Sequence, residues 1–94
     1  MGELKVRWTT QAADVPEAVF EFIAKDKPSA ARRIARKVRD CSRLLARYPQ
    51  LGRVANEPAT REIRVQGTPL ILVYRVSGEA IHLLAVFHGA QRRP

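Results

Sequence analysis

TREIRVQGTPLILVYRVSGEAIHLLAVFHGAQRRP, residues 60–94, is the stretch that decides the fold, because it predicts three consecutive antiparallel strands and a short basic tail. Residues 60–65 alternate between two side-chain directions, as a strand with one covered face does. Residues 70–76 are nearly all apolar and β-branched or aromatic, so we expect them to form the central strand. Gly67 and Gly78 lie in the turns that separate the three strands.

The last strand is predicted over residues 80–87. Simple alternation places one set on each face: Ile81, Leu83, Ala85 and Phe87 on one, and His82, Leu84, Val86 and His88 on the other. Two amphipathic helices can cover only one face of such a sheet. The second set, together with Arg75, would then form a half-open and partly apolar face, which is a candidate binding surface.

Residues 4–9 alternate with period two and predict a short first strand whose apolar side chains, Leu4, Val6 and Trp8, point into the core. A first helix is expected to begin at Asp14, a helix-capping residue followed by Pro16 in the first turn. It ends before Pro28.

A second helix is predicted from Pro28, with Pro49 and Gly52 stopping it. Its apolar stripe is formed by Ala31, Ile34, Val38, Cys41, Leu45 and Tyr48, widened by Ala35 and Leu44. Its other side carries Arg32, Arg33, Arg36, Lys37, Arg39, Arg43 and Arg47 against one acid, Asp40. The two helices would form an antiparallel hairpin, and residues 49–59 a surface loop.

The 94 residues have room for a single domain, residues 1–94. The 17 Lys and Arg against 9 Asp and Glu give a net charge of +8, which would attract nucleic acid, an anionic membrane surface or an acidic protein. One cysteine excludes an internal disulfide, and two histidines predict neither a structural metal site nor a cofactor. No apolar stretch has the length of a membrane span or the form of a signal peptide, so a cytoplasmic protein without a membrane partner is expected.

Six short motifs occur in the order of one known family: Trp8-Thr9, Ala30-Ala31-Arg32-Arg33-Ile34, Tyr48-Pro49-Gln50-Leu51-Gly52-Arg53, Thr60-Arg61-Glu62-Ile63, Leu72-Val73-Tyr74-Arg75-Val76 and Val86-Phe87-His88-Gly89-Ala90-Gln91. With these residues the chain resembles the RelE/ParE superfamily of bacterial type II toxins, over nearly its whole length. The resemblance implies an α+β fold of order βααβββ. In it, a two-helix antiparallel hairpin packs on one face of a small, mainly antiparallel four-stranded sheet.

The superfamily carries two activities on this fold. RelE-like members cut messenger RNA on the ribosome, whereas ParE-like members poison DNA gyrase. RelE-like toxins supply an Arg three residues before the Tyr that matches Tyr74, and here that position is Ile71. They often end the last strand with His or Tyr; His88 is present, but Gly89 replaces an aromatic residue that can follow it. An aliphatic side chain cannot stabilise a phosphorane, so the resemblance favours the ParE-like branch.

Three groups of candidate site residues follow. If the chain is a nuclease, the catalytic residues are His88, Arg61 and Arg75. The target-binding residues are Arg64, Gln91, Arg92 and Arg93. The antitoxin-binding residues are Arg32, Arg36, Arg39, Arg43 and Leu84. The expected partners are a cognate acidic antitoxin, in a hetero-oligomer, and either DNA gyrase or the ribosome with its mRNA. A basic RNA-binding domain without toxicity is the least favoured alternative, because no aromatic platform for bases is visible.

Overall fold

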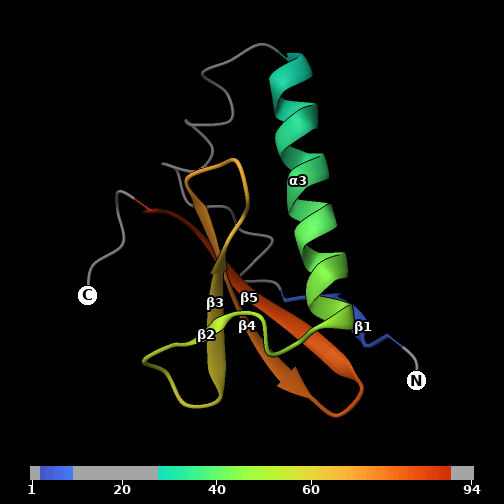
Figure 1. Cartoon of the computed structure of the whole chain (residues 1–94), viewed down its shortest axis with the longest axis vertical. Coiled ribbons are helices and arrows are strands. Elements are labelled where there is room, and N and C mark those ends of the chain that lie inside the picture. Colours follow the sequence, from blue (N-terminus) through green and yellow to red (C-terminus); the bar gives the residue numbers. More distant parts are fainter. Residues whose placement is uncertain (1–2, 10–27, 90–94) are drawn as a thin grey trace.

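The computed structural model of the chain describes residues 3–9 and 28–89. Within them, one helix packs against a five-stranded mixed sheet of order β1-β5-β4-β3-β2 (Figure 1). The helix is α3 (Pro28–Arg47), and the strands are β1 (Lys5–Trp8), β2 (Arg53–Val54), β3 (Thr60–Arg64), β4 (Leu70–Ser77) and β5 (Ala80–His88). The first predicted helix, with the hairpin it would form, lies outside the described residues.

The predicted meander is confirmed. β3, β4 and β5 pair antiparallel in chain order, and β4 is the central strand of the sheet. β1 forms one edge of the sheet and pairs parallel with β5, from Lys5 opposite Ala80 to Trp8 opposite Leu83. This pairing makes the sheet mixed, although its other pairings are antiparallel.

The expected number of four strands is wrong, because a fifth strand lies within the segment that we predicted to be a loop. In β2, Arg53 pairs with Glu62 and Val54 pairs with Arg61. The guanidinium of Arg53 also donates to Oε1 of the buried Glu62 carboxylate, at 3.0 Å from Nε and 2.6 Å from Nη2. A two-residue strand is too short to show a period in the sequence, so this pairing is visible only in the structure.

The core lies between α3 and one face of the sheet. It contains Ile34, Cys41 and Leu45 from α3 and Val65, Leu70, Leu72, Tyr74, Ile81, Leu83 and Val86 from the sheet side. The residues at the centre of the predicted apolar stripe of α3 are therefore buried, as expected. Leu44 and Ala35, expected to widen the stripe, are exposed, while Ser42 and Ala46 are buried instead. The buried side of α3 is turned toward β1, where the N–H of Leu4 donates to the carbonyl of Ala46 at 3.0 Å.

A β-bulge in β5 corrects the predicted alternation of that strand. Val73 pairs with Ala85 and Tyr74 pairs with Leu83, so Leu84 is an extra residue between them. The bulge reverses the side-chain phase of the residues that follow it. Val86 is consequently buried in the core with Leu83, whereas Phe87 is on the opposite face, where it is partly exposed.

Two aromatic residues that we expected in the core are exposed. Trp8 is 48% exposed, because it ends an edge strand that has a neighbour on one side only. Tyr48 is 53% exposed and lies one residue beyond the end of α3. Neither residue therefore contributes a fully buried ring to the core. In the parts of the chain that the structure describes, no helix combines the length and apolar character required to cross a membrane.

The loop after α3 is hydrogen-bonded to the sheet through Tyr74, which is fully buried. Its hydroxyl donates to the carbonyl of Pro49 at 2.7 Å and accepts from the N–H of Gly52 at 2.8 Å. Nη1 of Arg61 donates to the carbonyl of Gly52 at 2.6 Å. These bonds hold the loop on the face of the sheet that α3 covers.

Replacing Tyr74 by phenylalanine should destabilise the fold by about 1–3 kcal/mol, because it leaves the buried N–H of Gly52 and the partly buried carbonyl of Pro49 without their partner. Urea unfolding at neutral pH measures this loss. Tyr48→Phe, a change at an exposed ring, is the matched control and should leave the midpoint almost unchanged. Equal midpoints for wild type and Tyr74→Phe would contradict the role of the hydroxyl.

The same variant should respond differently to alkaline pH. Burial raises the pKa of Tyr74 above its ordinary value of 10, although the Gly52 hydrogen bond and the Arg61 charge partly oppose the rise. Between the two pKa values the unfolded chain has lost this proton and the folded chain has kept it. The contribution of the Tyr74 proton to stability is therefore fully present below about pH 10 and decreases as pH rises toward the folded pKa. This pH-dependent contribution should be absent from the Tyr74→Phe variant.

Candidate functional site

The three residues proposed for a nuclease do not converge. His88 lies at the end of β5, opposite Leu70, on the face that α3 covers. Arg61 pairs with Tyr74, four residues along β4 from Leu70, which is about 13 Å along the strand. Arg75 lies on the opposite face of β4, where it is exposed. A general base and its partners need to reach one reacting group within hydrogen-bond distance, and this arrangement does not bring the three together.

Arg61 already has a structural role. Besides its bond to Gly52, its Nη1 approaches the carbonyl of Gln50 at 3.5 Å, so the guanidinium is directed at the loop after α3. Ile71 pairs with Phe87 and Arg64 and, like Arg75, lies on the face of β4 opposite α3. Four residues separate Ile71 from Arg75, again about 13 Å along the strand.

Arg64 lies beside the start of the C-terminal tail. A Cβ built on Gly89 would be 3.7 Å from Nη2 of Arg64 and 3.8 Å from Cδ1 of Ile71. The N–H of Gly89 donates to the carbonyl of Pro69 at 2.7 Å, which fixes the end of β5 against the turn before β4. The structure thus groups Arg64, Ile71 and Phe87 on one face at this end of the sheet. The other three target-binding candidates, Gln91, Arg92 and Arg93, lie outside the described residues.

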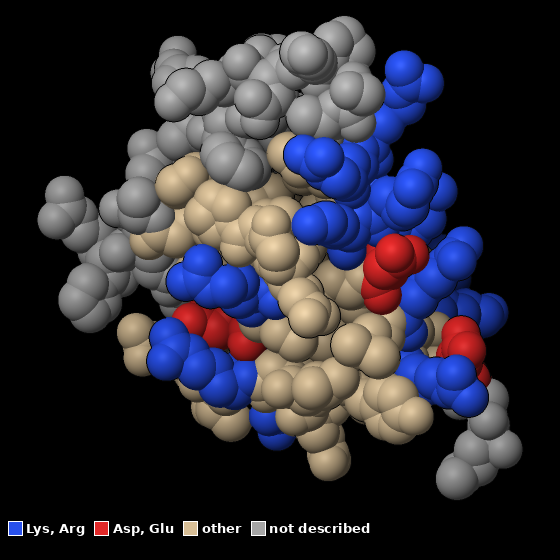
Figure 2. Space-filling model, turned by 45° about the horizontal axis from the view of Figure 1, so that its top comes forward, with Lys and Arg blue, Asp and Glu red and all other residues tan. Residues whose placement is uncertain are grey.

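The four arginines proposed for the antitoxin form one exposed stripe on α3. Arg32, Arg36, Arg39 and Arg43 are spaced by 4, 3 and 4 residues, which places them within about 60° around the helix. Figure 2 shows Lys and Arg side chains gathered along this side of the molecule, next to a surface formed mostly by residues without charge. The structure therefore groups these residues as the sequence predicted, on a surface that no described element covers.

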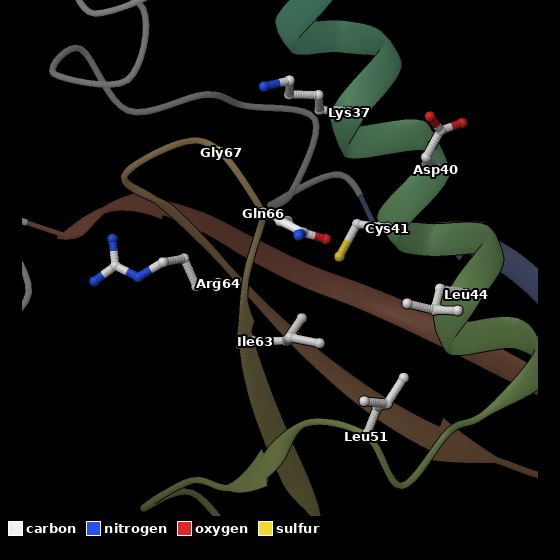
Figure 3. A pocket seen from close by; sticks show the side chains of 9 residues that line it. All are labelled: Lys37, Asp40, Cys41, Leu44, Leu51, Ile63, Arg64, Gln66 and Gly67. Carbon is white, nitrogen blue, oxygen red and sulfur yellow. The ribbon is translucent and has the colours of Figure 1, made fainter.

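Leu84, the apolar member of that set, occupies the bulge of β5 and is only partly exposed. The leucines that are most exposed in the described chain are Leu44, at 45%, and Leu51, at 49%. Both line a groove of about 640 Å³ between α3 and β3 (Figure 3). Its lining is completed by Lys37, Asp40, Cys41, Ile63, Arg64, Gln66 and Gly67.

Sequence reasoning missed this groove, because its walls come from four separate segments. The clearest available signal was the apolar Leu44 beside the basic stripe, which we assigned to the core. Cys41 contributes its sulfur to the floor, and burial raises the pKa of its thiol, so it remains a neutral packing group rather than a nucleophile. Among residues 3–9 and 28–89, no three His, Cys, Asp or Glu side chains are grouped to hold a metal ion.

Comparison with known proteins decides the family. A family model described as the ParE toxin of type II toxin–antitoxin system, parDE, matches residues 6–93. The chain belongs to the ParE toxin family. It is therefore a toxin of a type II toxin–antitoxin system.

Two curated relatives of this ParE family member are similar over nearly their full lengths. The putative toxin Y4kP of Sinorhizobium fredii is 33% identical over 94 residues, which is all of this chain and 97% of the relative. Toxin RelE2 of Caulobacter vibrioides is 31% identical over 87 residues, which is 93% of this chain and 97% of the relative.

Solved structures confirm the RelE/ParE-like α+β fold. A chain of the chromosomal ParDE system from P. aeruginosa superposes with a TM-score of 0.75 at 20% identity, over 92% of this chain and 96% of that one. A chain of the RelBE2 toxin–antitoxin complex from Mycobacterium tuberculosis gives 0.64 at 26% identity, over 93% and 99%. The fold expected from the resemblance is thus shared with both ParE-type and RelE-type toxins. The fold alone therefore does not separate the two branches, and any distinction between them has to come from individual side chains.

Proposed function

We propose that this ParE-family toxin inhibits DNA gyrase by binding, without catalysis of its own, and is neutralised by a cognate acidic antitoxin. The observation that carries the proposal is the separation of His88, Arg61 and Arg75, which occupy two faces and distant positions of the sheet. RNA cleavage needs a base, an acid and cations around one phosphate. The aliphatic Ile71 supports the same conclusion, because it stands where RelE-like toxins place an arginine.

The proposed contact with the target is the face where Arg64 lies, together with the tail that begins after Gly89. Phe87 and Ile71 add an apolar area beside the guanidinium of Arg64. Gln91, Arg92 and Arg93 would extend this surface. A partly apolar, cationic face of this kind is suited to a protein surface with acidic groups.

The antitoxin part of the proposal is supported by the exposed arginine stripe of α3 and by the net charge of +8. It is also supported by the solved RelBE2 relative, which is a toxin–antitoxin complex. An acidic partner would relieve the repulsion among these charges. The expected assembly is a hetero-oligomer of toxin and antitoxin.

Two assays on the purified toxin test the target. We expect inhibition of gyrase supercoiling and no codon-dependent cleavage of translated mRNA, for both wild type and His88→Ala. A chain that stops after Ala90 should lose inhibition of gyrase while its melting temperature changes little. Full inhibition by the shortened chain would place the target surface elsewhere, with α3 as the next candidate.

The second candidate function is ribosome-dependent mRNA cleavage, which is favoured by one observation: His88 is retained at the end of β5, the position where RelE-like toxins often have a catalytic His or Tyr. Its signature would be a cleavage product from wild type that decreases by about 10²–10⁴-fold in His88→Ala. Such a result, in a variant that still melts cooperatively, would overturn the gyrase proposal.

A further inference from the structure

A row of basic side chains crosses three neighbouring strands on the face of the sheet opposite α3. Arg7 of β1 lies opposite His82 of β5, and His82 lies opposite Arg75 of β4. Their chain neighbours Tyr74 and Leu83 are buried in the core under α3. Because side chains alternate along a strand, the three basic groups lie on the other face. We call these three residues the basic row.

The basic row is accessible and has no acidic partner within the described chain. Arg7 and Arg75 are exposed, and His82 is partly exposed. Among residues 3–9 and 28–89, none of the three side chains makes a hydrogen bond or an ion pair. Like charges that face each other across neighbouring strands destabilise a sheet. The row is therefore a cost to the fold, and a bound anion would offset it.

The next row on the same face is balanced within the chain. It contains Arg53, Glu62 and Val73, which pair across β2, β3 and β4. Nη2 of Arg53 lies 2.6 Å from Oε1 of Glu62, whose side chain is buried. This face thus provides a carboxylate for Arg53, whereas the described chain provides none for the basic row.

The surroundings of the basic row are small or charged. Toward β3 the row ends at Thr60, which is buried. At the next position of β1 on this face lies the exposed Lys5, which pairs with Ala80, and Ala80 pairs with Ser77. None of these positions holds a large apolar side chain. Protein interfaces are usually anchored by such side chains in an apolar centre, so this surface is poorly suited to a protein partner.

The phosphate backbone of a nucleic acid suits the basic row better, because phosphates require cations and donors and no apolar centre. Two strand spacings separate Arg7 from Arg75, which is about 9–10 Å. This span lies between the widths of the minor and major grooves of duplex DNA, about 6 and 12 Å. His82 has a ring N–H donor in either protonation state. The row contains no Asn or Gln to read bases, so its contact would be independent of sequence.

We propose that the basic row, extended by Lys5, binds the phosphate backbone of duplex DNA, so that the toxin contacts gyrase and the DNA of gyrase together. The inference rests on the proposed function and deepens it by naming a second partner of the same face. The proposed gyrase contact, at Arg64, Ile71 and Phe87, lies at the other end of this face. Ile71 is about 13 Å along β4 from the basic row. One toxin molecule can thus touch both the enzyme and the duplex bound to it.

Binding of a short fluorescent DNA duplex to the purified toxin, measured at several salt concentrations, tests the inference. Arg7→Gln combined with Arg75→Gln should lower the affinity by about tenfold or more. It should also reduce the slope of log K against log salt by about 1 for each phosphate contact that is lost. Arg33→Gln combined with Arg47→Gln is the matched control, because it removes the same charge from exposed positions of α3. Its affinity should change by less than about threefold. Equal losses for the two double variants would overturn the inference, because net charge rather than the row would then bind DNA.

The melting temperature separates loss of a contact from loss of the fold. Both arginines are exposed and lie beside His82 without an acidic partner in the described chain, so replacing them by glutamine should leave the melting temperature unchanged or slightly raised. A large decrease would show that the two arginines stabilise the sheet, and it would contradict their assignment to a partner.

Gyrase with and without DNA distinguishes failure of the inference from failure of the proposed function. Wild type and the Arg7→Gln, Arg75→Gln variant should bind DNA-free gyrase equally well. On gyrase with bound duplex, the variant should bind about tenfold or more weakly than wild type. Equal binding of the two toxins to both forms of gyrase would overturn the inference. A wild-type toxin that binds neither form would refute the proposed target, whereas the measurement on the free duplex would still decide the role of the basic row.

Other polyanions test the choice of duplex DNA. We expect the toxin to bind the duplex more tightly than single-stranded RNA of the same length or phosphatidylglycerol vesicles at the same phosphate concentration. Tighter binding to the RNA or to the vesicles, lost in the Arg7→Gln, Arg75→Gln variant, would assign the row to that partner and overturn the inference.

Discussion

Replacing Gly52 by alanine should be among the most destabilising single changes in the described chain. A Cβ at this position would lie 2.5 Å from the hydroxyl oxygen and 2.7 Å from Cε1 of Tyr74, and 2.9 Å from the carbonyl oxygen of Glu62. None of these atoms can move easily, because Tyr74 is fully buried and the carbonyl belongs to β3. The clash and the loss of the Tyr74 hydrogen bonds should together cost about 3–5 kcal/mol.

Chemical unfolding of the purified variant measures this cost. Gly78→Ala is the matched control: Gly78 also lies in a turn, with φ of 60°, but nothing surrounds the position of its Cβ within 4 Å. That variant should lose only about 1–2 kcal/mol, the conformational cost of a left-handed alanine. Similar losses for the two variants would show that close packing against Tyr74 is not what requires glycine at position 52.

The meander and α3 could be predicted because their signals are local. Turn residues bound β4 and β5, and Ile34, Cys41 and Leu45 follow helical spacing from the capping proline onward. The bulge at Leu84 could not be predicted, since residues 83–86 are all apolar and fit either alternation phase. Only the pairing of β5 with β4 and the packing of α3 decide which of these side chains is buried.

The sequence predicted the part of the candidate site that lies on a single element. It did not predict the part that is formed by several elements together. The arginine stripe lies on α3 alone, so helical periodicity was sufficient to group it. The groove joins Leu44 to Leu51 and Ile63 through the folding of the loop onto Tyr74. Leu44 and Ala46 could both have been core residues by spacing, and the position of β1 buries Ala46 and leaves Leu44 exposed.

Raising the salt concentration from 50 to 500 mM should slow association of toxin and antitoxin by about 10–10³-fold, because it screens the charges that steer the encounter. Dissociation should change little, because apolar contacts between the two proteins become no weaker in salt. Association and dissociation rates recorded separately over this range measure both effects.

The arginine stripe and the groove should therefore affect different rates. Arg39→Gln combined with Arg43→Gln removes two exposed charges from α3 and should lower the association rate and its dependence on salt. Leu51→Asp should act mainly on dissociation, because it places a charge on an exposed leucine of the groove, where apolar contacts with a partner would be lost. Were salt alone to release the antitoxin from the wild-type toxin quickly, charge would be holding the complex together. The apolar groove would then not be the main source of its stability.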